Sequence, residues 1–332
     1  MQVAAQKIVV LGTGGTIAGT AGDASDNIGY TAGQVGVQQL LEAIPGLAKA
    51  AGGGELVTEQ IAQVDSKDMD HAIWQRLSER CAVHLADPEV RGIVITHGTD
   101  TLEETAWFLR LVLDARKPVV LTCAMRPATA LSPDGPQNLL DAMAVATAEG
   151  AHGVVAVAAG TVHGAEQVRK VHPYRVDAFD SGESGPLGWV EEGQVRLARD
   201  WPAAEPLYPQ LPWSRAGEAP PANPASAVDW PRVDIVLSHA AASGRVVDLL
   251  AADGVDGLVV AATGNGTVHA ALEAALLRAQ MAGVAVRVAS RCPLGRVLPR
   301  PGDALQAETQ GLGAVKTRVS LMLHLLAARH RR

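Results

Sequence analysis

Aromatic side chains are scarce in this sequence. Its 332 residues include only two Phe, three Tyr and six Trp, although 48% of the residues are hydrophobic. Alanine, valine and leucine must therefore build the cores, which suits helices packed on both faces of a parallel sheet. The length exceeds the ~100–200 residues of one ordinary domain, so we expect two domains.

Cysteine, positive charge and long apolar runs are also in short supply. The three cysteines, Cys81, Cys123 and Cys292, are far apart and predict no disulfide framework or metal pair, and no HExxH motif occurs. The net charge of −7 argues against nucleic-acid binding. No apolar run reaches the ~18 residues of a membrane span or has the form of a secretory signal. We therefore expect a cytoplasmic protein, although a mature exported chain would look the same.

Short β-branched runs alternate with longer stretches of helical spacing in the first two thirds of the chain. The expected strands are 7–11, 91–96, 118–122 and 153–157, and the expected helices are 70–85, 101–113 and 137–148. This order predicts a larger N-terminal α/β domain, residues 1–200, with a mainly parallel sheet flanked by helices.

A proline-rich segment, 201–231, interrupts this pattern with eight of the nineteen prolines. Proline fixes φ and removes a donor, so we interpret the segment as a linker. The alternation then resumes in a smaller C-terminal α/β domain, 232–332, for which we expect a flavodoxin-like layering. Its expected strands are 233–237, 257–261 and 284–288, and its expected helices are 246–252, 268–282 and 315–328.

Glycines follow the first expected strand, in Gly12-Thr-Gly-Gly-Thr-Ile-Ala-Gly19. Ligands of open α/β sheets bind beyond the carboxyl ends of strands, so this turn is a candidate site. One interpretation is a dinucleotide-binding turn, but its third glycine would fall at Ile17. The other is that the glycines bend the backbone sharply and present the hydroxyl of Thr16. The turn alone does not decide between them.

A second polar turn follows the strand 91–96 and reads Thr96-His-Gly-Thr-Asp-Thr-Leu-Glu-Glu104. Helix capping by Asp100 or Thr101 would explain the acids, but not a second threonine, Thr99, at a strand end. Two such threonines suggest hydroxyl nucleophile chemistry, which needs a base. Lys170 is a candidate base if it is buried, and otherwise a surface charge. Tyr30 lies in the loop after the first turn, where a packing role is the alternative.

Both turns resemble the signatures of the bacterial-type L-asparaginases, the asparaginase/glutaminase family with a threonine nucleophile. The matching segments are Thr13-Gly-Gly-Thr-Ile-Ala-Gly19 and Val94-Ile-Thr-His-Gly-Thr-Asp-Thr-Leu-Glu-Glu-Thr105. Further matches follow in family order and cover nearly the whole chain: Tyr30 to Gly33, Ser66 to Met69, Ala124 to Pro127, Asp134 to Pro136 with Asn138, Gly185 to Gly188, and Gly264 to Gly266.

The resemblance implies hydrolysis of L-asparagine to L-aspartate and ammonia, with a possible weaker glutaminase activity. Thr16 would attack the amide carbon and form an acyl-enzyme, helped by Tyr30. Thr99, Asp100 and Lys170 would form a second catalytic group and assist acyl transfer, and backbone N–H groups around Thr99 would face the oxyanion. Asp100 would also bind the substrate ammonium.

The family needs no metal or organic cofactor, and its members are usually homotetramers built as dimers of intimate dimers. Ser66 would bind the substrate carboxylate, and Asn265 of the C-terminal domain would complete a neighbour's site. Lys67 departs from the uncharged or acidic residue of many relatives beside the substrate ammonium. Relatives often have a glutamate that the neighbouring subunit supplies to the site. In this chain Asp303 is the nearest acidic residue to the corresponding position.

Three other functions are weighed against this one. A related amidase could act on another amide, such as a D-amino acid amide or a tRNA-linked glutamine donor. A nicotinamide-dependent oxidoreductase would use the Gly12 turn, where Ile17 weighs against it. A non-catalytic binding protein would not need Thr16, Thr99, Asp100 and Lys170 together.

Overall fold

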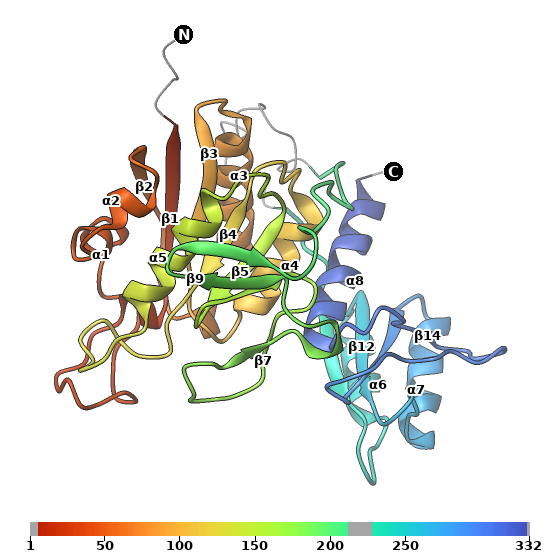
Figure 1. Ribbon diagram of the computed structural model, residues 1–332. Coiled ribbons are helices and arrows are strands. Elements are labelled where there is room, and N and C mark those ends of the chain that lie inside the picture. The colour runs from red at the N-terminus through yellow and green to blue at the C-terminus, as the bar shows by residue number, and fades with distance from the viewer. Residues whose placement is uncertain (1–5, 212–227, 331–332) are drawn as a thin grey trace. The chain divides into compact units, whose positions relative to one another are not determined.

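The computed structural model describes residues 6–211 and 228–330 and divides into two compact units, Met1–Ala222 and Asn223–Arg332 (Figure 1). Residues 212–227, the greater part of the proposed linker, lie outside the described residues. No helix among the described residues is both long and apolar enough to cross a membrane.

An eight-stranded sheet forms the centre of the N-terminal unit. Its order is β10-β9-β6-β5-β4-β3-β1-β2, and β2, β1, β3, β4 and β5 run parallel. The strands span Lys7–Gly14 (β1), Glu55–Val64 (β2), Val90–Thr96 (β3), Val119–Thr122 (β4), Val154–Ala158 (β5), Thr161–Gly164 (β6), Gly188–Glu191 (β9) and Gln194–Leu197 (β10). β7 (Arg169–Lys170) and β8 (Phe179–Asp180) form a separate two-stranded sheet.

Helices cover the parallel strands of this sheet (Figure 1). They are α1 (Val37–Glu42), α2 (Leu47–Ala50), α3 (His71–Ala86), α4 (Leu102–Val112) and α5 (Gly135–Ala146). Side chains of α1, α2 and α5 pack in one cluster with Ile8, Val10 and Val94 of the sheet. Ile8, Val9, Val10 and Leu11 are all buried, as expected for a central strand covered on both faces.

The expected four strands and three helices of this unit are confirmed to within a few residues, but several strands were missed. β2 has only Ile61 buried because it lies at the sheet edge, and its mixed polar sequence resembles no buried run. The strands of the hairpin β9 and β10 are short, four residues each, and partly exposed, around the turn Glu192-Gly193. Edge strands bury one face at most, so their apolar pattern is weak.

The C-terminal unit contains a four-stranded parallel sheet in the order β11-β12-β13-β14. Its elements are β11 (Val233–Leu237), α6 (Arg245–Ala252), β12 (Gly257–Ala262), α7 (Ala270–Met281), β13 (Ala285–Ser290), β14 (Gln306–Ala307) and α8 (Ala314–Arg329). The expected elements are confirmed. A flavodoxin sheet is ordered 2-1-3-4-5, so the likeness to flavodoxin is in the layering alone.

Candidate functional site

The two polar turns lie side by side because β1 and β3 are neighbouring parallel strands. The hydroxyl of Thr13 donates to the carbonyl of Thr96 at 2.9 Å and ties the two strand ends together. β1 ends at Gly14, and a three-residue 3-10 helix, η1 (Thr16–Ala18), follows it. A dinucleotide turn would place phosphate at the start of a longer helix, which this turn does not provide.

Thr16 is the first residue of η1 and is only 6% exposed. Its Oγ1 lies 2.6 Å from the hydroxyl of Tyr30, and either oxygen could be the donor. The loop that carries Tyr30 is anchored by backbone hydrogen bonds in both directions between Thr20 and Thr31. The structure thus brings together the first predicted pair, a threonine hydroxyl and a phenol.

Lys170 lies on β7 and reaches the second turn. Its Nζ donates to Oγ1 of Thr99 at 2.7 Å and to Oδ1 of Asp100 at 2.6 Å. The Lys170 side chain is 17% exposed, whereas that of Asp100 is 52% exposed. Lys170 is therefore not a solvated surface charge, which was the alternative. The structure brings Thr99, Asp100 and Lys170 together.

Ser66 begins a short 3-10 helix, η2 (Ser66–Asp68), and is buried. Its Oγ accepts a hydrogen bond from the amide of Asp100 at 3.1 Å, and its carbonyl accepts one from the hydroxyl of Thr101 at 2.7 Å. An Oγ that accepts in this way keeps its own proton for another acceptor. Ser66 can therefore hold the second turn and still offer a donor to an anionic ligand group.

Thr101 occupies the N-cap position of α4 but makes no side-chain capping bond. Helix capping was the competing explanation for this turn. Thr101 does occupy the N-cap position, but its hydroxyl donates to Ser66 and not to an amide of α4. The sequence did not predict the hydrogen bond from Thr101 to Ser66, although a hydroxyl residue directly after Asp100 can be seen in the sequence. The two residues are 35 positions apart, and sequence spacing does not predict a contact over that separation.

Lys67 is held by its own loop. Its Nζ lies 2.8 Å from a carboxylate oxygen of Asp65 and 3.3 Å from one of Asp68. The hydrogen bonds that Lys67 donates to Asp65 and Asp68 raise its pKa above the ordinary value. Both acids compensate its charge, so the cation does not stand alone beside Ser66.

Asn265 lies in the C-terminal unit, in a turn after β12. Its amide donates to the carbonyl of Leu298 at 2.9 Å and accepts from the Leu298 amide at 2.7 Å. One N–H and one lone pair of the side chain are left for another partner. Asp303 accepts a bond from the amide of Arg300 at 2.7 Å, which stabilises a turn of the same segment.

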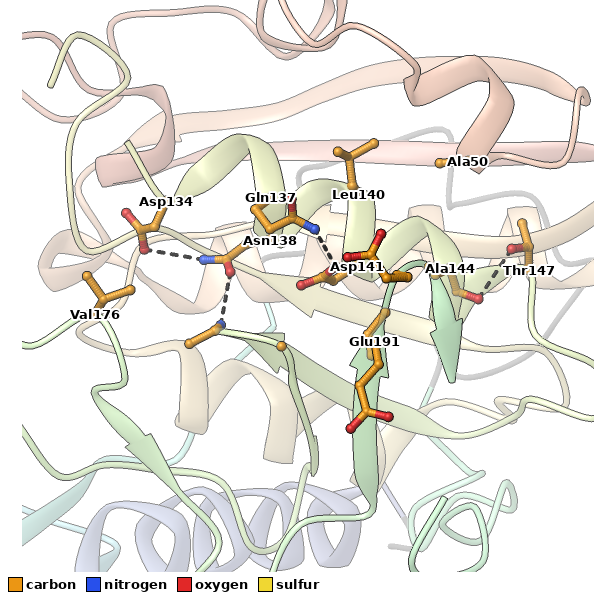
Figure 2. Close-up of a pocket in the computed structure, with 15 residues that line it drawn as sticks. Ala50, Asp134, Gln137, Asn138, Leu140, Asp141, Ala144, Thr147, Val176 and Glu191 are labelled. Carbon is orange, nitrogen blue, oxygen red and sulfur yellow. Dashed lines mark hydrogen bonds between the residues drawn. The ribbon is translucent and has the colours of Figure 1, made fainter. Parts of the chain in front are cut away.

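The matched motif around Asp134 and Asn138 has a structural role (Figure 2). Asp134 accepts from the amides of Met125 and Arg126, each at 2.9 Å. The Asn138 amide group donates to Cys123 and Asp134 and accepts from the amide of Ala159. These bonds tie the start of α5 to the segments that follow β4 and β5.

A cavity of about 830 Å³ opens beside the same helix, as Figure 2 shows. Its lining includes Asp134, Asp141, Glu191 and Glu192, and excludes Thr16, Thr99 and Lys170. Burial raises the pKa of Asp141, while a hydrogen bond from Gln137 opposes the shift. The cavity and the paired threonines are thus separate features of the N-terminal unit, and the threonines are the stronger candidates for chemistry.

Comparison with known proteins gives matches over both units. The family model "Asparaginase, N-terminal" matches residues 7–203, and "Glutaminase/Asparaginase C-terminal domain" matches residues 232–331. L-asparaginase 2 of Escherichia coli is 36% identical over 295 residues, which are 88% of this chain and 80% of the relative. Glutaminase-asparaginase of Pseudomonas fluorescens is 35% identical over 298 residues, 89% of this chain and 78% of the relative.

A solved structure agrees with these sequence matches. The crystal structure of a probable cytoplasmic L-asparaginase from Campylobacter jejuni superimposes with a TM-score of 0.86 at 36% identity. The match covers 98% of both chains.

Proposed function

The chain belongs to the asparaginase/glutaminase family of amide hydrolases, and we propose that it converts L-asparagine and water to L-aspartate and ammonia through a threonine acyl-enzyme. One observation carries the proposal. Two threonine hydroxyls lie on adjoining turns, one against a phenol and the other against a lysine–aspartate pair. Paired groups of this kind are what a hydroxyl nucleophile requires.

In the proposed first step, Oγ1 of Thr16 attacks the side-chain amide carbon of the substrate. The C–N bond breaks, the hydroxyl proton passes to the departing nitrogen, and ammonia leaves an ester on Thr16. The 2.6 Å contact with Tyr30 supports this step, because the phenol can accept and return a proton at the attacking oxygen.

In the second step, water attacks the ester carbon, and L-aspartate leaves as Thr16 recovers its proton. Thr99 and Lys170 are proposed to assist the transfer, Thr99 losing its proton towards Lys170. The 2.7 Å contact between Oγ1 of Thr99 and Nζ of Lys170 supports this role. Asp100 holds the lysine in place through the 2.6 Å contact of its Oδ1 with Nζ.

Asp100 and Ser66 are the proposed anchors of the α-amino acid group. Asp100 is half exposed and uses only Oδ1 in its bond with Lys170, so Oδ2 can meet an ammonium. Ser66 can donate its proton to a carboxylate, as its contacts above allow. One methylene is worth only ~1–3 kcal/mol of discrimination in a pocket, so a weaker activity on L-glutamine is expected.

The test is ammonia release from L-asparagine, D-asparagine, L-glutamine and simple aliphatic amides, with purified enzyme. We expect L-asparagine to give the highest kcat/KM and L-glutamine a lower one. A Thr16→Ala variant is the control for contaminating activity. A preference for a D-amino acid amide or a simple amide would instead identify the related amidase that was weighed above.

We also propose that the protein is a cytoplasmic homotetramer, a dimer of intimate dimers, in which Asn265 completes the site of a neighbour. Support comes from the family membership and from the cytoplasmic asparaginase that the fold matches. Thr16→Ala and Asn265→Ala chains should each be severely impaired. Refolded together, about half of the two-fold pairs should be mixed, each with one intact site, so about a quarter of the activity should return.

Mixed oligomers without regained activity would show that each chain builds its own site. Chromatography with differently tagged chains establishes whether mixing has occurred. Because Asn265 also holds Leu298, loss of activity in Asn265→Ala includes the release of that segment. The recovered quarter is therefore the informative quantity.

A further inference from the structure

A buried line of hydrogen bonds runs from the protein core to the second turn. Nε1 of Trp74 donates to Oγ1 of Thr105 at 2.9 Å, and that hydroxyl lies 2.9 Å from Nε2 of His97. Nδ1 of His97 then lies 2.7 Å from the carbonyl oxygen of Gly98. His97 and Thr105 are fully buried, and Trp74 stacks on Phe108.

The chemistry of the two ends fixes the direction of the two outer bonds in this line. The indole Nε1 can only donate, and the Gly98 carbonyl can only accept. Thr105 therefore accepts from Trp74, and Nδ1 of His97 carries the proton that it donates to Gly98. When the ring is neutral, Nε2 has no proton and accepts from the hydroxyl of Thr105.

Burial lowers the pKa of His97 to about 4, so the neutral ring persists through the physiological range. A second proton would enter at Nε2, where the Thr105 hydroxyl already donates. The ring is consequently a fixed donor towards Gly98 rather than a proton carrier.

The Gly98 carbonyl shares its peptide plane with the amide N–H of Thr99. In a trans peptide these two groups point in opposite directions, and the described chain contains no cis peptide. A bond that fixes the carbonyl therefore also fixes the direction of the N–H. In the described part of the chain, this N–H donates to no protein group, although Thr99 is only 6% exposed.

We propose that His97 is a positioning residue for amide hydrolysis: its Nδ1–H holds the Gly98 carbonyl and so aims the Thr99 N–H at the oxygen of the scissile amide. Thr105 acts on His97 by fixing its tautomer, and Trp74 fixes Thr105. The inference rests on the proposed function, because it needs an oxyanion to form beside Thr99. It adds the residue that orients the donor.

Asparagine and glutamine at position 97 separate positioning from simple packing. The amide nitrogen of Asn can occupy the place of Nδ1 and donate to Gly98, but Asn cannot reach Thr105. Gln can reach the place of Nε2 and meet Thr105, but it leaves the Gly98 carbonyl without its donor. Both variants lose part of the same buried network, so both should lose similar thermal stability.

The experiment compares kcat, KM and Tm of the wild type with those of His97→Asn, His97→Gln and Thr105→Ser, using L-asparagine. We expect His97→Gln to lose about 10- to 100-fold in kcat with little change in KM, since removing one oxyanion donor outright costs about 100- to 1000-fold. His97→Asn should keep kcat within about 5-fold, by the same reasoning. Thr105→Ser keeps the hydroxyl and should behave like the wild type.

Equal kcat losses in His97→Asn and His97→Gln, or losses that follow Tm, would overturn the positioning role and leave His97 a packing residue. In that case an active wild type would leave the proposed function intact. A wild type that releases no ammonia would overturn both.

Discussion

Gly15 and Gly98 face each other across the two turns with no room for a side chain on either. A Cβ built on Gly15 would lie 2.3 Å from the Cα of Gly98, and one built on Gly98 would lie 2.4 Å from Oγ of Ser66. Gly15 also has a φ of 80°, which favours glycine. The separation of Thr16 from Thr99 is thus set by two glycines in backbone contact.

A methyl group at position 98 should therefore disturb the site. We expect Gly98→Ala to reduce kcat at least about 100-fold, because misplacement by about 1 Å can cost that much, and to lower stability by ~1–3 kcal/mol. Kinetics and urea unfolding measure the two effects. Gly313→Ala is the control, since a Cβ there meets no atom within 4 Å. Similar kinetics for both variants would contradict the contact.

Removal of the proposed nucleophile should abolish turnover and leave the fold intact. We expect Thr16→Ala to be inactive, and Thr16→Ser to keep part of kcat because the attacking oxygen survives. Tyr30→Phe removes the hydroxyl that lies 2.6 Å from Thr16 and should lower kcat more than it raises KM. Circular dichroism checks the fold. An active Thr16→Ala would assign the attack to another group.

Lys170 tests the second group. Lys170→Met keeps much of the side-chain volume but loses both hydrogen bonds to Thr99 and Asp100. We expect a large loss of kcat with little change in KM. Steady-state kinetics of the wild type and the variant provide the measurements. A wild-type rate in Lys170→Met would exclude the lysine from the chemistry.

Lys67 should affect affinity rather than the chemical step. Its removal in Lys67→Gln leaves Asp65 and Asp68 without their cation, which should favour a bound ammonium. We expect KM for L-asparagine to fall about 2- to 3-fold at low salt, less at high salt, because Lys67 is largely exposed. Succinamic acid, which lacks the ammonium, is the control substrate. A higher KM for both would mean that Lys67 contacts the substrate carboxylate.

The buried His97 should make the stability of the protein depend on pH. Its pKa is about 4 in the folded protein, below the ~6.5 of an exposed histidine, so the unfolded chain binds the additional proton. Its contribution to stability is present above pH ~6.5 and is lost as pH falls, by up to ~1.4 kcal/mol per unit, until pH ~4. Unfolding free energies of the wild type and His97→Asn should therefore converge on acidification. A pH-independent difference would contradict a buried neutral ring.

Sequence alone identified the buried central strands, the longer helices and the polar turns that follow β1 and β3, because buried β-branched runs and glycine clusters are local signals. It also placed both turns at the carboxyl ends of strands, where open α/β sheets bind their ligands. The edge strand β2 escaped notice because its exposed positions carry polar side chains. The hairpin of β9 and β10 did so for the same reason.

Sequence patterns did not predict which side-chain atoms form hydrogen bonds between residues far apart in the chain. Capping of the helix by Asp100 or Thr101 was the alternative explanation of this turn, but the Thr101 hydroxyl donates to the carbonyl of Ser66, 35 positions away. The bonds of the Asn265 amide to Leu298 could not be predicted either, and they leave one N–H and one lone pair for the neighbour's site in which Asn265 is proposed to act. A hydrogen-bonding side chain has many possible partners, and only the folded backbone selects among them.

The placement of the three cysteines gives the protein a single accessible thiol. Cys81 and Cys123 are buried, and burial raises the pKa of both thiols, whereas Cys292 is exposed. Thiolate is the reactive form, so alkylating reagents and maleimide dyes should select Cys292 in the native protein. That residue begins the segment that Asn265 holds at Leu298. A fluorophore at Cys292 would therefore report directly whether another subunit covers this segment.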